Sequence, residues 1–143
     1  MKLHLHLGQQ DLAGYTNVDA SQTSIDLANI QSLCDQAECI DLVVNDLLKF
    51  MPYEKLPEVV HHMSSRLRHG GKMTLIFTDL NSILREYDRG TVNEKLLNQL
   101  MFASGARSCF THAHILNILR AIKLKVSSVE ISKEQVIIIA ERP

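Results

Sequence analysis

Residues 40–80 are typical of a strand, a helix and a second strand, and this unit constrains the fold more than any other part of the chain. Residues 40–44 and 72–78 are short apolar runs of the kind that form strands covered on both faces. Between them, Pro57 suits the first turn of a helix, apolar residues recur at helical spacing, and the Gly-Gly pair at residues 70–71 is expected to end the helix. Such a crossover is right-handed and makes the two strands parallel.

Ligands of parallel sheets bind beyond the carboxyl ends of the strands, which points to residues 45–51 and 79–82. Asp46 and Asp79 follow the two neighbouring strands, so two carboxylates could line one cleft. Asp79 also precedes a helical pattern, where an acid satisfies free backbone amides, and we favour a helix cap for it. Asp46 stays a candidate site residue.

Further strand patterns stand at both ends of the chain. Residues 2–7 alternate leucine with histidine, residues 15–19 form a short apolar-polar run, and residues 126–131 and 135–140 form a hairpin-like pair. Only residues 9–14 separate the first two strands, whereas a helical crossover takes about a dozen residues or more. Any helix there is a single turn or absent. We therefore predict one α/β sheet, mostly parallel, with an antiparallel final strand.

Three shorter helices are predicted between the central unit and the final hairpin. Their expected caps are Asn81, then Thr91 as part of a capping box, then Thr111. Residues 21–39 are polar and mixed in period, which indicates a loop with at most a short strand or helical turn.

Length, charge and composition limit the classes of protein to which this chain can belong. A chain of 143 residues suits one domain over residues 1–143, and a net charge of -1 gives no electrostatic reason to expect nucleic acid or an anionic membrane as partner. No apolar stretch approaches the roughly 20 residues of a membrane span, and a signal-peptide layout is lacking, so we expect a cytoplasmic protein. Cys34, Cys39 and Cys109 lack metal or redox spacing, which favours reduced thiols.

Six of the seven histidines stand in three close pairs. They are His4 with His6 on one face of a strand, His61 with His62, and His112 with His114. Because these spacings lack the i, i+4 pairing and the carboxylate partner of zinc enzymes, we predict no metal site. A single histidine such as His62 or His112, expected near the carboxyl ends of the strands, could serve as a general base, but a partly exposed surface histidine is the commoner outcome. The cysteines have no base at a motif spacing, so no nucleophilic catalysis is predicted.

Several strings resemble the class I S-adenosylmethionine-dependent methyltransferases. LHLG at residues 5–8 followed by GYTNVD at residues 14–19 is similar to small methyltransferase-like proteins, in which a first strand enters a Gly-x-Gly turn and a short connection leads to a Gly-aromatic-x-Asn-Val-Asp strand. Residues 64–80 resemble their helix, Gly-Gly, strand and acid segment, and residues 110–129 their closing helix and strand. The resemblance covers essentially the whole chain.

The resemblance implies a set of cofactor-binding residues. Gly8 would let the backbone approach the methionine end of S-adenosylmethionine, with Gln9 beside it, and Asp19 would accept hydrogen bonds from the ribose hydroxyls. Asp26 matches an Asp-Leu pair near the adenine. Asn45 and Asp46 end the strand that faces the transferred methyl group. The resemblance identifies no catalytic residue and no methyl acceptor, and a small molecule, a glycan or a protein side chain could each accept the methyl group.

The first loop departs from the family pattern, because Gly8 is followed by two glutamines instead of a second glycine. We expect a more open pocket and weak affinity for the cofactor. The missing covering helix would leave apolar sheet surface, so we also expect self-association, for instance as a homodimer. The alternative is a non-catalytic binding or assembly module with the same fold.

Overall fold

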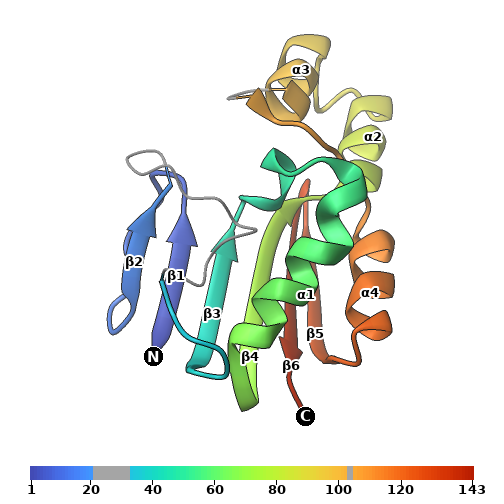
Figure 1. Ribbon diagram of the computed structural model, residues 1–143. Coiled ribbons are helices and arrows are strands. Elements are labelled where there is room, and N and C mark those ends of the chain that lie inside the picture. Colours follow the sequence, from blue (N-terminus) through green and yellow to red (C-terminus); the bar gives the residue numbers. More distant parts are fainter. Residues whose placement is uncertain (21–32, 103–104) are drawn as a thin grey trace.

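The computed structural model describes residues 1–20, 33–102 and 105–143. Its strands form one six-stranded sheet in the order β2-β1-β3-β4-β6-β5 (Figure 1). The strands are β1 (Lys2–His6), β2 (Thr16–Asp19), β3 (Cys39–Asn45), β4 (Leu67–Thr78), β5 (Lys125–Ser132) and β6 (Gln135–Glu141). Strands β2, β1, β3 and β4 pair in parallel, and β6 pairs antiparallel with β4 and β5. The predicted mostly parallel sheet with an antiparallel final strand is confirmed.

Two helices cover one face of this sheet. They are α1 (Leu56–Arg66), which links β3 to β4, and α4 (His112–Ala121), which precedes β5, and they lie side by side in Figure 1. The side chains that they bury alternate along the strands and include Leu5, Val44 and Leu75. The opposite face carries Ile76, which is only half-buried. The apolar core therefore lies between the sheet and the α1–α4 layer.

The remaining helices stand beyond the carboxyl ends of the strands. They are two short 3-10 turns, η2 (Leu48–Phe50) and η3 (Tyr53–Lys55), and the helices α2 (Leu80–Asp88) and α3 (Glu94–Phe102) (Figure 1). No helix of the described residues is both long and apolar enough to cross a membrane. The described residues 7–15 contain no helix, as the short spacing between β1 and β2 predicts. Of the predicted loop at residues 21–39, residues 21–32 lie outside the described part.

The end of α1 differs from the prediction. The helix ends at Arg66, and the glycines that we expected to end it lie within β4. Cys39 pairs with Leu67 and Asp41 pairs with Lys72, so β4 advances by five residues where β3 advances by two. A Cβ on Gly71 would lie 2.9 Å from the carbonyl oxygen of Cys39, so glycine is required for the close approach of the two strands.

Two of the predicted helix caps are wrong and one is confirmed. The cap of α2 is Asp79, not Asn81, because the Asp79 carboxylate accepts from the backbone N–H of Ser82. Asn93 caps α3 by accepting from the N–H of Leu96, while the Thr91 hydroxyl contacts Glu86 instead. Thr111 caps α4 as predicted, accepting from the N–H of His114.

Candidate functional site

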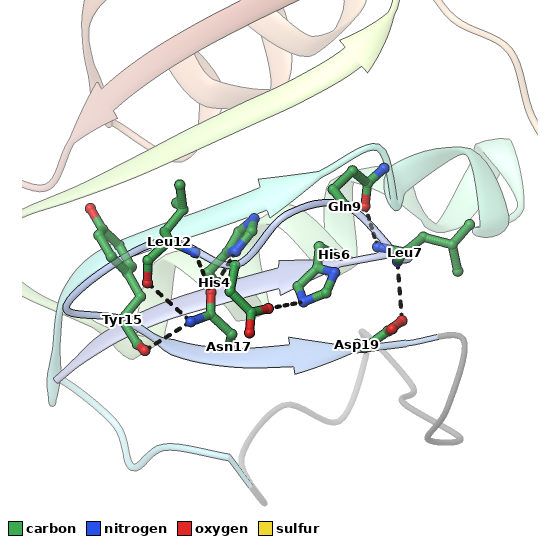
Figure 2. A network of polar contacts seen from close by, with 10 residues as sticks. His4, His6, Leu7, Gln9, Leu12, Tyr15, Asn17 and Asp19 are labelled. Carbon is green, nitrogen blue, oxygen red and sulfur yellow. Dashed lines mark hydrogen bonds and ion pairs between the residues drawn. The ribbon is translucent and has the colours of Figure 1, made fainter.

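Gly8 and Asp19 meet where β1 and β2 end. Figure 2 shows Asp19 at the end of β2, close to the loop that follows β1. Gly8 has a φ of 76°, a left-handed conformation that favours glycine, and its N–H donates to Oδ1 of Asp19 over 3.1 Å. A Cβ built on Gly8 would meet nothing within 4 Å, so open space lies beside its Cα. The structure thus brings together the glycine and the acid that the sequence singled out 11 residues apart.

Gln9 turns back onto its own loop. Its side-chain oxygen accepts from the backbone N–H of Leu7 over 2.5 Å, so the amide group lies against the end of β1 (Figure 2). This bond fixes Gln9, which stands at the middle position of the Gly-x-Gly pattern, whereas Gln10 takes the place of the second glycine. It also shows how a long side chain is accommodated at this turn without a clash.

The first loop, whose described residues 7–15 contain no helix, is held in position by a polar network centred on Asn17 (Figure 2). The Asn17 side chain accepts from Nδ1 of His4 over 2.8 Å and from the N–H of Leu12 over 2.9 Å. Its amide donates to the carbonyls of Leu12 and Tyr15 over 3.0 and 3.1 Å. One half-buried asparagine on the edge strand β2 therefore joins β1, β2 and the loop between them.

Two further contacts tie the same loop to the sheet. Nε2 of His6 lies 3.2 Å from the Asp11 carboxylate, and the Tyr15 hydroxyl donates to Asp41 of β3 over 2.5 Å. The hydrogen bond to Asp41, together with burial, raises the pKa of Tyr15 to about 12, so this phenol stays protonated at neutral pH. The loop is anchored at both ends by side chains that the sequence did not single out as partners.

The predicted shared face of His4 and His6 is confirmed, because their rings stack at 4.8 Å and both are buried. Sequence reasoning missed that these rings hold the first loop. The available signal was the strict alternation of histidine with leucine, since a buried polar side chain needs a nearby partner. The register of β1 with β2 supplies it by placing His4 beside Asn17.

Asn45 and Asp46 lie at the end of β3, one strand further along the sheet. Asp46 has a φ of 57°, its N–H donates to the carbonyl of Ile76, and its Oδ2 lies 2.8 Å from Nζ of Lys49. Its Oδ1 is buried without a hydrogen-bond partner among the described residues. The sequence pointed to Asp46 but not to its pairing with Lys49.

Asp79 is fully buried and acts as a double cap, which agrees with the favoured cap role. It accepts from Ser82 and also from the backbone N–H and Nδ1 of His112, over 2.7 and 3.1 Å. Burial alone would raise the pKa of Asp79, but the hydrogen bonds from Ser82 and His112 outweigh it and hold the pKa below its ordinary value. Asp79 is thus committed to joining α2 and α4 rather than lining a cleft with Asp46.

The remaining sequence candidates lie elsewhere. His62 belongs to the second half of α1, which runs back toward the amino ends of the strands, and not near the carboxyl ends as we expected. Burial is the main cause that lowers its pKa. Asp26 lies outside the described residues. Cys34 and Cys39 are free and buried, and burial raises the pKa of Cys34 to about 11.

Solved structures share this architecture. An O-methyltransferase family protein from Burkholderia thailandensis superposes with a TM-score of 0.63 at 16% identity, over 90% of this chain and 36% of that chain. The fold is that of the class I methyltransferases. Magnesium protoporphyrin IX methyltransferase from Synechocystis PCC 6803, with bound S-adenosylhomocysteine, superposes with a TM-score of 0.56 at 17% identity, over 90% and 52% of the two chains.

A third methyltransferase-fold neighbour is matched over more of its length. It is the 1,6-didemethyltoxoflavin-N1-methyltransferase from Burkholderia thailandensis with bound 1,6-didemethyltoxoflavin and S-adenosylhomocysteine, at a TM-score of 0.62, 14% identity, and 98% and 70% of the two chains. No protein-family model matches the sequence, and no curated protein matches it. The chain spans 36% and 52% of the first two of these solved chains, so the likeness concerns the methyltransferase fold alone.

Proposed function

We propose that this protein binds S-adenosylmethionine at the carboxyl ends of β1, β2 and β3 and transfers its methyl group to a small molecule. The observation that carries the proposal is the pairing of Gly8 with Asp19, which sets a Cβ-free backbone beside a carboxylate at the edge where such sheets bind ligands. The methyltransferase-fold neighbours with bound S-adenosylhomocysteine support the choice of cofactor.

The residues at this edge fit the cofactor. Gly8 would face its methionine end, because a side chain there would fill the open space beside the Cα. Asp19 would hold the ribose hydroxyls, and Gln9 would lie next to the glycine. Asn45 and Asp46 would flank the methyl group. The cofactor would supply an electrophilic methyl group, and the acceptor would supply the lone pair that receives it.

The absence of a helix after β1 limits the strength of binding. In a complete fold of this kind, the start of that helix presents free backbone amides to the ligand. Here a loop held by Asn17 takes its place among residues 7–15. A cofactor bound at this edge would therefore be left open on this side, and we propose weak cofactor affinity with slow turnover.

Calorimetric titration tests the proposed function directly. Titration with S-adenosylmethionine and with S-adenosylhomocysteine is expected to show saturable binding in the micromolar-to-millimolar range, weaker than a closed pocket gives because part of the contact surface is missing. If no binding is seen at millimolar ligand, the proposed enzymatic function is ruled out, and the alternative is a non-catalytic binding or assembly module. A competition experiment with adenosine would show whether the nucleoside half supplies the affinity.

Asp19→Ala is expected to weaken cofactor binding about tenfold or more, because a charge-assisted hydrogen bond to ribose contributes about 1.5 to 3 kcal/mol. The matched control is Asp19→Asn, which keeps an oxygen for the Gly8 N–H but removes the charge. Thermal melts of both variants separate loss of the loop contact from loss of ligand contact. Equal affinities for wild type and Asp19→Ala would place the ribose site elsewhere.

A further inference from the structure

Strand β5 is a free edge of the sheet. It is the last strand in the sheet order, it is eight residues long, and no strand of the described chain pairs with its outer side. Two large apolar side chains on it are exposed, Val129 by 40% and Ile131 by 50%. An edge of this length presents a row of backbone donors and acceptors that another strand can pair with.

A bulge in β5 changes which side chains share a face. The register with β6 shifts between Val126 and Ser128, so Ser127 is the extra residue. Lys125 stands opposite Glu141, and Glu130 stands opposite Ile137. Because those two β6 partners are an even number of residues apart on a regular strand, they share a face.

Lys125 and Glu130 therefore lie on the same face of β5, although an unbulged strand would place residues five apart on opposite faces. By the same reasoning Val126 and Val129, which stand opposite Ala140 and Ile138, share the other face. The side chains of Lys125 and Glu130 are both exposed. The bulge thus gives the edge a basic end and an acidic end on one face.

We propose that β5 pairs antiparallel with β5 of a second copy of this chain, about a two-fold axis that passes between Ser127 and Ser128. In this register each Lys125 faces the other copy's acid at position 130, and each Val126 faces the valine at position 129. Every contact occurs twice, as an isologous two-fold interface requires. Opposite charges directly across a strand pair stabilise it, and like charges destabilise it.

The charge pattern selects the antiparallel second copy over other arrangements. A parallel pairing in the same register would set lysine against lysine and glutamate against glutamate. The self-association that we predicted from the short first loop was expected at the sheet face near that loop. The dimer proposed through β5 instead lies at the opposite edge of the sheet, far from β1 and β2 (Figure 1).

Analytical ultracentrifugation over a concentration series tests this dimer without any cofactor. Wild type is expected to show a monomer–dimer equilibrium. Lys125→Glu and Glu130→Lys are each expected to weaken it about tenfold or more, because two attractive pairs become two repulsive ones. The double variant, with both charges exchanged, is expected to recover the wild-type affinity. Lys95→Glu on α3 is the control for net charge and should leave the equilibrium unchanged.

Recovery in the double variant cannot come from a general effect of charge, so it would establish the paired register. A wild-type protein that stays monomeric at every concentration would overturn the proposal. Single variants that dimerise as well as wild type would overturn it too, by placing the interface elsewhere. Circular dichroism of each variant checks that these exposed substitutions leave the fold intact.

Discussion

Replacing Asp79 with alanine is expected to lower the free energy of unfolding by about 3 kcal/mol or more. The carboxylate is fully buried and accepts from the N–H and hydroxyl of Ser82 and from the N–H and Nδ1 of His112. Alanine would leave all of these donors without their acceptor. Because domains of this size are stable by only about 5 to 15 kcal/mol, chemical denaturation should resolve the loss easily.

Two further variants make the result specific. Ser82→Ala removes only the hydroxyl donor and is expected to cost about 1 kcal/mol. Asp79→Asn keeps one acceptor oxygen but turns an amide toward donors. Its loss of unfolding free energy should therefore lie between the losses of Ser82→Ala and Asp79→Ala. A loss no larger for Asp79→Ala than for Ser82→Ala would show that the carboxylate does not join α2 to α4.

The same contacts predict how stability depends on pH. The pKa of Asp79 is lowered in the folded state, so its charge contributes stability that is present above the unfolded pKa of about 3.9 and is lost as the pH falls through the folded pKa. The difference in unfolding free energy between wild type and Asp79→Asn should be constant above about pH 5 and shrink below about pH 4. A difference that does not change with pH would contradict this assignment.

Gly71→Ala is expected to destabilise the protein by about 2 to 3 kcal/mol, because the new methyl group would overlap backbone atoms that cannot rotate away. Its Cβ would lie 2.9 Å from the carbonyl oxygens of both Arg68 and Cys39. Gly70 is the matched control, since it has a φ of 75° and open space around its Cα. Gly70→Ala should cost only about 1 to 2 kcal/mol, through backbone strain.

Urea titration of the two glycine variants gives a simple ranking. We expect Gly71→Ala to be the less stable, even though only Gly70 has the left-handed conformation that usually requires glycine. Gly70→Asn should cost less than Gly70→Ala, because asparagine tolerates this conformation. The reverse order of the two alanine variants would mean that β3 and β4 can separate at this point without much cost.

The strands and the main helices could be predicted from the sequence because their signals are local. The apolar runs at β3 and β4, the alternation in β1 and the short spacing before β2 each depend on neighbouring residues only. The confirmed sheet follows from these patterns, whereas the methyltransferase fold was expected from the resemblance of several strings to that family. The proposed cofactor residues stay predictions, although Gly8 and Asp19 do meet.

The contacts that position the candidate site needed the tertiary structure. The second half of the Asp79 cap comes from His112, 33 residues further along the chain. Gly71 is constrained by a carbonyl of another strand, which a Gly-Gly pair alone does not reveal. The bulge that sets Lys125 and Glu130 on one face is visible only in the register with β6. Local patterns fix which segments become strands and helices, whereas packing between distant segments decides which polar groups find partners and which positions admit no side chain.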